Sequence, residues 1–397
     1  MWYPRFLTSS LLNVARQFPV VTLTGPRQSG KTTLIKHTFP EYTYVSLELP
    51  DQRAFAQEDP RGFLRHFSPP VIFDEIQRVP ELLSYLQVRV DEQPEPGQYI
   101  LTGSHNFLLH EGIAQSLAGR TALLYLLPFS KRELFQEPDY TPFQFPPDPP
   151  PSTNYPYLWQ IIFQGFYPRI HAHQINAHEW YAYYYQTYIE RDVRLIVNIG
   201  DLQTFDKFIR LCAGRSAQII NHSSLAADAG ISITTAKRWL SILQASFIIA
   251  LVSPHFENFR KRLIKSPKLY FLDTGLLTFL LHIRTPQELA FHAQRGAVFE
   301  TFIFSELYKL HLHHNTPPSI YFWHDVKHHE VDFILDRGST LLPVEVKSGE
   351  TVTRDQFRSL KYYQKLADSR TETPILIYGG DTSYLRDGIQ VLSWQWL

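Results

Sequence analysis

Cysteine, long apolar runs and net charge are all scarce in this sequence. Its single cysteine, Cys212, excludes an intramolecular disulfide framework. No apolar run approaches the roughly 18 residues of a membrane span, and residues 1–5 lack the charged region and apolar core of a secretion signal. We therefore expect a cytoplasmic protein with no membrane partner. Because 38 basic residues balance 38 acidic ones, any contact with nucleic acid would have to come from local patches.

The 397 residues, 44% of them hydrophobic and 14% aromatic, indicate a globular chain of more than one domain, since single cores rarely grow beyond about 250 to 300 residues. Eight prolines between Gln136 and Pro156 exclude a helix or central strand there and predict a stiff connector. A proline-rich ligand for a partner's aromatic groove is the alternative. The expected domains are residues 1–135, 157–285 and 286–397, with residues 136–156 as the linker.

A phosphate-binding P-loop lies between an apolar run, residues 19–24, and a helix-like segment, residues 32–38. Its residues fit G-x-x-x-x-G-K-[ST], and those expected to bind nucleotide are Gly25, Pro26, Arg27, Gln28, Ser29, Gly30, Lys31, Thr32 and Thr33. The glycines let backbone N–H groups face the phosphates, Lys31 supplies positive charge to the β and γ oxygens, and Thr32 offers a hydroxyl to Mg²⁺. ATP and Mg²⁺ are therefore the expected ligands.

Residues 1–135 alternate between strand and helix patterns, which predicts an α/β domain with a parallel sheet covered by helices. The candidate strands are residues 20–24, 43–47, 71–74 and 98–102, and the candidate helices include residues 60–66 and 80–91. The third strand ends in Asp74 and Glu75, at the edge where α/β sheets bind ligands. We expect Asp74 to hold Mg²⁺ through water and Glu75 to orient and deprotonate the attacking water.

Two further residues are candidates for the phosphoryl-transfer site. Ser104 follows the strand 98–102 and could act as a sensor beside the γ-phosphate, although Thr102 would serve equally well. Arg120 could stabilise the transition state, either in the same chain or from a neighbouring subunit, or it could form a surface ion pair. A role in a neighbour's site would require a homo-oligomer.

The middle of the chain, residues 157–210, is mostly helical in pattern and rich in aromatic residues. Six of them lie close together in the sequence: Trp180, Tyr181, Tyr183, Tyr184, Tyr185 and Tyr188. Core packing is the favoured interpretation, and a base-stacking platform is the alternative.

A helix-turn-helix pattern follows. Residues 223–229 form one helix, Gly230 to Ser232 the turn, and residues 233–245 a second helix with an apolar face of Ile233, Ala236, Leu240 and Leu243. Residues 247–252 and 268–272 would be the strands of a wing. A basic face is expected from Thr234, Thr235, Lys237, Arg238, Arg260, Lys261, Arg262, Lys265 and Lys268. This winged helix would either bind DNA or act as a structural lid.

The last hundred residues carry a second group of charged residues. Residues 296–313 are helical in pattern and include Glu300, and residues 330–335 and 341–347 are expected to pair as strands. The strand period places Glu345 and Lys347 on one face, where Asp332 of the adjacent strand can join them. Two carboxylates facing one point would bind Mg²⁺, and the lysine would position or deprotonate a water that attacks a phosphodiester. A surface ion pair is the alternative. A helix, 354–368, and strands 374–378 and 389–393 complete the expected elements.

Taken together, these motifs resemble those of the AAA+-related ATPases of microbial genomes that carry a C-terminal domain of unknown function. The resemblance rests on residues 25–34, 74–77, 100–104, 188–193, 265–275 and 344–347, and thus covers nearly the whole chain. It implies an AAA+ core, a winged helix and a C-terminal fold similar to the PD-(D/E)xK restriction-endonuclease-like nucleases. In such a fold Asp332, Glu345 and Lys347 would occupy the signature positions and Glu300 the position of the helical acid.

Two functions fit these expectations. The first is an ATPase that couples its nucleotide state to DNA or RNA engagement and carries a Mg²⁺-dependent nuclease at its C-terminus. The second is a nucleotide-controlled switch or assembly protein whose nuclease-like domain is inactive and binds a partner. They differ in whether Asp332, Glu345 and Lys347 gather around a metal.

Overall fold

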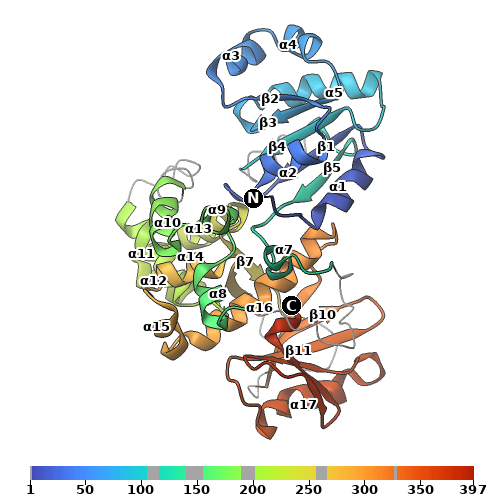
Figure 1. Ribbon diagram of the computed structural model, residues 1–397. Coiled ribbons are helices and arrows are strands. Elements are labelled where there is room, and N and C mark those ends of the chain that lie inside the picture. Colours follow the sequence, from blue (N-terminus) through green and yellow to red (C-terminus); the bar gives the residue numbers. More distant parts are fainter. Residues whose placement is uncertain (1, 105–115, 140–154, 189–201, 256–265, 326–328) are drawn as a thin grey trace.

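The computed structural model describes residues 2–104, 116–139, 155–188, 202–255, 266–325 and 329–397. Three groups of elements follow one another along the chain, shown in Figure 1 as a blue to cyan unit, a green to yellow group of helices and an orange to red unit. Several expected features lie outside the described residues: linker residues 140–154, residues 189–193 of the family resemblance, and Arg260, Lys261, Arg262 and Lys265.

The N-terminal unit is a five-stranded sheet in the order β2-β3-β4-β1-β5, and every pair of neighbouring strands is parallel. Its strands are β1 (Val20–Thr24), β2 (Thr43–Ser46), β3 (Val71–Asp74), β4 (Tyr99–Gly103) and β5 (Thr121–Tyr125). Its helices are α1 (Leu7–Ala15), α2 (Lys31–Thr38), α3 (Pro50–Glu58), α4 (Pro60–His66) and α5 (Leu82–Glu92), with the short 3-10 helix η1 (Ile76–Arg78). All residues of β1, β3 and β4 are buried, as in a sheet covered on both faces. The expected parallel sheet is confirmed, whereas α1 was not anticipated.

The middle group is built from short helices around aromatic side chains. It comprises α7 (Lys131–Phe135), α8 (Leu158–Gln164), α9 (Pro168–His173), α10 (Ala177–Tyr184) and α11 (Leu202–Ala213). Five of the six clustered aromatic residues are buried, and Tyr183, at 69% exposure, is the exception. The rings pack on one another, with Trp180 stacked on Tyr184 at a centroid distance of 4.8 Å. The core interpretation is therefore confirmed for these five residues.

Two helices and a small sheet occupy the region where a winged helix was expected. Helix α12 (His222–Ala229) ends at Gly230 in the left-handed conformation, and Ser232 caps α13 (Ile233–Ala245) by accepting a hydrogen bond from the Thr235 backbone N–H. Strands β6 (Gln218–Ile219), β7 (Ile249–Val252) and β8 (Lys268–Phe271) form an antiparallel sheet in the order β6-β8-β7. The expectation for Ile233 was wrong: it is 46% exposed, and the buried face of α13 begins one turn later, at Ala236.

The C-terminal unit is a six-stranded mixed sheet with the long helix α16 against it. The strand order is β13-β14-β12-β11-β10-β9, and the neighbouring strands β10 and β11 are antiparallel as expected. The strands are β9 (Ile320–His324), β10 (Glu330–Asp336), β11 (Leu341–Lys347), β12 (Ile375–Tyr378), β13 (Tyr384–Arg386) and β14 (Ile389–Ser393). The helices are α14 (Thr274–Leu280), α15 (Pro286–Phe291), α16 (Arg295–His313) and α17 (Arg358–Ala367), with 3-10 helices η3 (Arg354–Phe357), η4 (Asp368–Arg370) and η5 (Trp394–Trp396).

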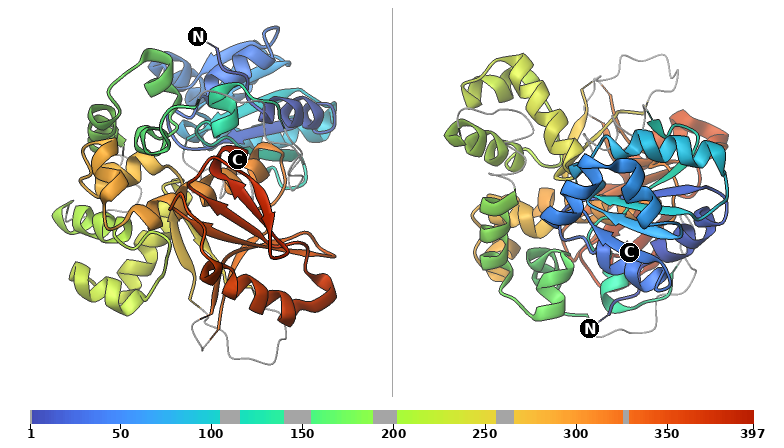
Figure 2. Two further views of the ribbon diagram at one scale, coloured as in Figure 1. Left: turned by 60° about the horizontal axis from the view of Figure 1, so that its bottom comes forward. Right: turned by 90° about the horizontal axis from the view of Figure 1, so that it is seen from above.

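The three units share polar and apolar contacts, and one hydrophobic cluster runs from Leu127 through the middle helices and α16 to Leu397. Packing is therefore continuous across residues 285 and 286, where the sequence suggested a boundary. Helix α7 also meets the end of the chain, because Lys131 Nζ donates to the Gln395 carbonyl at 2.6 Å. Figure 2 shows the orange α16 close to both the blue unit and the red sheet. Among the described residues, no helix is both long and apolar enough to cross a membrane.

Candidate functional site

The P-loop connects the carboxyl end of β1 to the first turn of α2. Gly25 has a φ of +151°, and a Cβ there would lie 2.1 Å from the Leu126 carbonyl oxygen. Gly30, at a φ of +97°, is the left-handed residue immediately before α2. Both positions require glycine, one because of a close backbone approach and both because of their conformation. The loop is thereby fixed at the N-terminus of a helix, where backbone N–H groups and the helix dipole favour an anion.

The Lys31 side chain folds back onto the loop itself. Its Nζ donates to the carbonyl oxygens of Gly25 and Pro26, each at 2.9 Å, and the residue is only 6% exposed. Burial lowers the pKa of the Lys31 ammonium to about 8, although the nearby carboxylates of Glu75 and Asp74 oppose the shift. A phosphate group would replace two neutral acceptors with a charged one, so anion binding would favour the protonated lysine.

Asp74 lies at the centre of a polar group formed by three elements. Thr32 Oγ1 donates to Asp74 Oδ2 at 2.9 Å, and Tyr44 Oη donates to the same oxygen at 2.6 Å. Thr102 Oγ1 donates to Asp74 Oδ1. Thr32 and Asp74 are thus neighbouring oxygen donors beside the P-loop, which fits the ligand chemistry that Mg²⁺ prefers. Tyr44 was not chosen from the sequence, and Thr102 was considered only as an alternative sensor, because only the sheet order places β2 and β4 on either side of β3.

Glu75 follows Asp74 in the left-handed conformation, with a φ of 59°. Ser104 Oγ donates to Glu75 Oε2 at 3.0 Å, and Gln77 Nε2 donates to the same oxygen. The two alternatives considered for the sensor therefore contact different carboxylates: Thr102 donates to that of Asp74, whereas Ser104 donates to that of Glu75. Ser104 and Gln77 hold the Glu75 carboxylate in place at the carboxyl edge of the sheet.

Arg120 lies at the wrong edge of the sheet for a role in this chain's own site. Arg120 directly precedes β5, and its backbone carbonyl accepts a hydrogen bond from Val20 at the start of β1. The P-loop follows the other end of β1, five strand residues or roughly 16 Å away. Its guanidinium forms a two-point ion pair with Asp91, Nε–Oδ1 at 2.5 Å and Nη2–Oδ2 at 2.9 Å. The assignment of Arg120 as a transition-state arginine in the same chain is therefore wrong, and the surface ion pair is what the structure shows.

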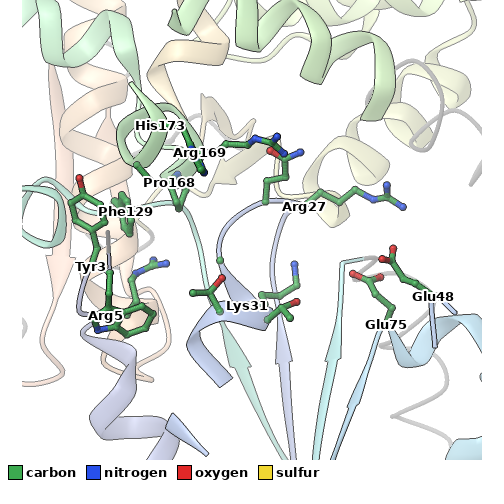
Figure 3. A pocket seen from close by; sticks show the side chains of 16 residues that line it. Tyr3, Arg5, Arg27, Lys31, Glu48, Glu75, Phe129, Pro168, Arg169 and His173 are labelled. Carbon is green, nitrogen blue, oxygen red and sulfur yellow. The ribbon is translucent and has the colours of Figure 1, made fainter. Parts of the chain in front are cut away.

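A cavity of about 620 Å³ opens over the P-loop. In Figure 3, Tyr3 and Phe129 lie on one side of Lys31, whereas Glu75 and Glu48 lie on the other. The upper wall belongs to α9 of the middle group, which contributes Arg169 and His173. The full lining is Trp2, Tyr3, Arg5, Arg27, Gln28, Gly30, Lys31, Thr32, Thr33, Glu48, Glu75, Phe129, Pro168, Arg169, Ala172 and His173. No local sequence pattern indicated the α9 residues, because they are about 140 residues away from the P-loop.

A buried arginine, Arg5, links the P-loop to the rest of the molecule. Its Nη1 donates to the Ser29 carbonyl at 2.8 Å, its Nη2 donates to the Leu127 carbonyl at 2.7 Å, and its Nε lies 3.1 Å from Glu133 Oε1. The same Glu133 oxygen accepts a hydrogen bond from the Phe6 backbone N–H at 2.8 Å.

On the other side of Glu133, His313 of α16 lies with its Nδ1 3.4 Å from Oε1. Burial lowers the pKa of His313 to about 3, so this imidazole is neutral. Arg5 is therefore the charge that compensates Glu133. One polar group joins P-loop, α1, α7 and α16.

The expected basic face of the helix-turn-helix is reduced in the structure. Thr234, Lys237 and Arg238 are exposed on α13, and Thr235 is half-buried. Lys268, which was assigned to this face, is only 2% exposed and points into the protein, so its assignment was wrong.

The C-terminal carboxylates do gather, as expected. Glu345 and Lys347 share one face of β11, with Lys347 Nζ 2.6 Å from Glu345 Oε1. Asp332 of β10 accepts a hydrogen bond from the Val346 backbone N–H at 2.8 Å. Burial, followed by the Asp332 charge, raises the pKa of Glu345 to about 8, and burial raises the pKa of Glu300 to about 7.

Two cations lie among these carboxylates: Lys347 beside Glu345, and Lys268 beside Glu300 and Asp332. The Lys268 Nζ lies 3.2 Å from Glu300 Oε1 and 3.8 Å from Asp332 Oδ1, and it also forms an ion pair with Glu330. Among the described residues, no group of three or more His, Cys, Asp and Glu side chains is arranged to hold a metal ion. The metal site expected from Glu300, Asp332 and Glu345 stays a prediction: a lysine from a distant strand lies beside Glu300 and Asp332, and Glu345 is paired with Lys347.

Comparisons with known proteins divide the chain into three parts. Residues 17–135 match an AAA domain, residues 155–287 a domain of unknown function (DUF8612), and residues 295–397 a further domain of unknown function (DUF4143). The chain is 29% identical over 381 residues to the uncharacterized proteins Rv2008c of Mycobacterium tuberculosis and Mb2031c of Mycobacterium bovis, covering 95% of this chain and 80% of each relative.

Solved structures show weaker likenesses. The Walker-type ATPase PABY2304 of Pyrococcus abyssi is 15% identical, with a TM-score of 0.39, covering 69% of this chain and 94% of that one. A signal transduction ATPase with numerous domains, PH0952 from Pyrococcus horikoshii, is 13% identical, with a TM-score of 0.21, covering 75% of this chain and 47% of that one. With TM-scores this low, neither likeness bears on the chain's function. The AAA match and the parallel P-loop sheet together show that the N-terminal unit is an AAA-type, ATPase-like domain.

We expect nucleotide affinity to fall as the pH rises above about 8. The nucleotide-free Lys31 has a pKa of about 8, and bound phosphate oxygens would raise it, so binding takes up a proton wherever the free lysine is neutral. The last phosphate proton of ATP leaves near pH 6, so the ligand charge is constant over this range. Calorimetric Kd values should be level from about pH 7 to 7.5 and weaken by up to about tenfold per unit above pH 8. Lys31→Arg, which stays protonated, should bind with a flat profile, and a flat wild-type profile to pH 9.5 would contradict the assignment.

Proposed function

We propose that this protein is an ATP-binding and ATP-hydrolysing switch, in which the nucleotide state of the P-loop is transmitted to the middle and C-terminal units. The C-terminal unit, despite its nuclease-like arrangement of Asp332, Glu345 and Lys347, would bind a partner without cutting nucleic acid. The observation that carries the proposal is the contact of Arg5 with both the P-loop, at Ser29, and Glu133 beside α16.

The chemistry assigned to the N-terminal site follows from the neighbours of each side chain. Backbone N–H groups of the P-loop and Lys31 would bind the phosphates. Thr32 and Asp74 would hold Mg²⁺, which neutralises charge on the β and γ oxygens. Glu75, held by Ser104 and Gln77, would orient the attacking water and accept its proton.

Arginines of the same chain are available for the transition state. Arg27 and Arg169 both line the cavity, one from the P-loop and one from α9. Arg27 also lies over the Tyr188 ring, with its guanidinium carbon 5.7 Å from the ring centroid. Closure of α9 onto bound ATP would bring Arg169 toward the phosphates. Self-association is therefore compatible with this proposal without being needed to supply an arginine.

Transmission would proceed through buried groups that have few alternative partners. A shift of the P-loop on phosphate binding moves the Ser29 carbonyl, to which Arg5 is hydrogen-bonded. If Arg5 followed the Ser29 carbonyl alone, its ion pair with Glu133 would loosen. That separation is unfavourable, because a buried charge left without its partner costs several kcal/mol. Glu133 in turn caps the start of α7 and contacts His313 at the end of α16. The polar group therefore has to change as a unit.

The ATP assignment predicts distinct effects for two substitutions. Lys31→Ala should abolish ATP binding, because it removes the charge at the β and γ phosphates. Glu75→Gln should keep binding and lower kcat by about 10² to 10⁴, because it removes only the general base. With wild-type protein, Mg-ATP at about 100 times its Kd should add roughly 2.7 kcal/mol to the free energy of unfolding. Arg120→Ala serves as the control with unchanged turnover, and full thermal stabilisation of Lys31→Ala by Mg-ATP would refute the site.

The coupling assignment is tested by Arg5→Lys, which keeps a positive charge near Glu133 but cannot bridge three partners. We expect ATP to slow amide hydrogen exchange of residues 295–313 in the wild type and to have little effect on those residues in Arg5→Lys. Arg16→Lys, an exposed arginine just after α1, is the matched control and should behave as wild type. An undiminished response of α16 in Arg5→Lys would show that the signal, if present, takes another route.

Nucleic-acid engagement by the helix-turn-helix is a second candidate function, favoured by the exposed Lys237 and Arg238 on α13. If α13 contacts a DNA or RNA backbone, affinity should fall linearly with the logarithm of salt concentration. Lys237→Ala with Arg238→Ala should flatten that slope by about one unit per lost phosphate contact. Arg354→Ala with Lys365→Ala, a pair on the far unit, is the control. Identical binding isotherms for the two double variants would leave α13 with a structural role.

A further inference from the structure

We propose that Lys268 is a built-in cation of the C-terminal unit: its ammonium pairs with Glu300, Glu330 and Asp332, engages two of the three acids expected to bind a metal, and thereby closes the nuclease-like site to metal. The inference rests on the proposed non-cleaving function of this unit and names the residue responsible for it. It is independent of how ATP is bound.

The elements that form this cluster are far apart in the sequence. Lys268 is the first residue of β8 in the three-stranded sheet, Glu300 lies on α16, and Glu330 and Asp332 lie on β10. Tyr270, two residues along β8 and therefore on the same face as Lys268, donates to Glu300 Oε1 at 2.6 Å. Two side chains of one strand thus hold the same helical carboxylate.

A lysine at this position and a metal ion exclude one another. Mg²⁺ binds oxygen ligands at about 2.0 to 2.1 Å, and its ligands must converge on one point. The ammonium of Lys268 already contacts Glu300 and Glu330 directly, so a metal between these oxygens would lie in contact with a second positive charge. Such an arrangement is strongly repulsive in a site with little water.

Burial of Lys268 is itself evidence that the carboxylates compensate the charge of the lysine. An ammonium withdrawn from water to 2% exposure loses hydration worth several kcal/mol, and only closely placed negative charges compensate for that loss. Three carboxylates lie within ion-pair distance of Nζ. Were those carboxylates engaged by a metal, Lys268 would have no compensation and would not stay buried.

The cluster also has a mechanical consequence. Lys268 joins the sheet next to the helix-turn-helix to the helix and sheet of the C-terminal unit, through charges instead of apolar packing alone. The cluster is therefore a fixed bridge between two units, whereas Lys347, with about a third of its side chain exposed, remains on the accessible side of the same sheet. A partner would meet Lys347, with the buried Glu345 and the bridge behind it.

The decisive experiment measures metal binding and thermal unfolding of nucleotide-free protein with MnCl₂ or MgCl₂ as the only added ligand. Wild-type protein should show no Mn²⁺ bound at this cluster by electron paramagnetic resonance and no metal-dependent rise in Tm. Lys268→Met keeps the side-chain length but leaves the carboxylates without a cation, so its Tm should drop by several degrees and recover with added Mn²⁺. Neither the wild type nor any variant that retains Lys268 should cleave DNA or RNA.

Three controls make the outcome specific. Lys268→Arg retains the positive charge and should remain insensitive to metal. Lys268→Met combined with Asp332→Asn should lose the metal-dependent recovery. Lys347→Met removes the neighbouring, more exposed lysine and should behave as wild type towards metal.

If Lys268→Met does not fold, the wild-type protein decides the question. Wild-type Mn²⁺ binding that Asp332→Asn abolishes, or metal-dependent cleavage by the wild type, would overturn the proposal, and absence of both supports it. ATP affinity measured on the same samples separates the two claims. If wild-type protein does not bind ATP, the switch function is refuted, and the proposed role of Lys268 is unaffected.

Discussion

Compensation of buried charge by a specific partner is the constraint on which this structure depends. Arg5 and Glu133 lie out of water where the three units meet, and each is stable there only because of the other. The arginine also donates a hydrogen bond to the backbone of the P-loop, and the glutamate also accepts one from the backbone at the N-terminus of α7. The nucleotide site and the other units are thus connected through one buried ion pair.

The same principle operates at the far end of the molecule with a different result. There the buried cation is Lys268, and the carboxylates around it belong to the constellation that the sequence suggested for a metal. Acidic residues that gather in a protein interior require a positive charge, but a sequence motif does not specify whether a metal or a side chain supplies it. In this chain the lysine comes from the sheet beside the helix-turn-helix, so the compensation also holds two units together.

Local patterns predicted much of the fold and the core of the nucleotide site. The P-loop, the strand ending in Asp74 and Glu75, and the paired strands β10 and β11 are each encoded within short segments, by glycine positions, apolar runs and alternation. Residues whose position depends on the whole fold were missed or misassigned. Arg120 was given a catalytic role because its sequence context is compatible with one, and only the parallel pairing of β5 with β1 shows that it lies at the opposite edge. Lys268 was counted with a basic surface because a lysine at the start of an expected strand gives no sign of its burial.

The sequence by itself determined the chemistry of the P-loop, since spacing and residue type there fix both backbone conformation and ligand contacts. It also determined the alternation of strands and helices that produces a parallel sheet, because the different side-chain periods of strands and helices are local properties. Tertiary structure alone decided which charges meet: Arg5 with Glu133, Arg120 with Asp91, Arg169 with the P-loop cavity and Lys268 with Glu300. These contacts join residues 29 to about 140 positions apart, and nothing in a local pattern encodes a distance across the fold.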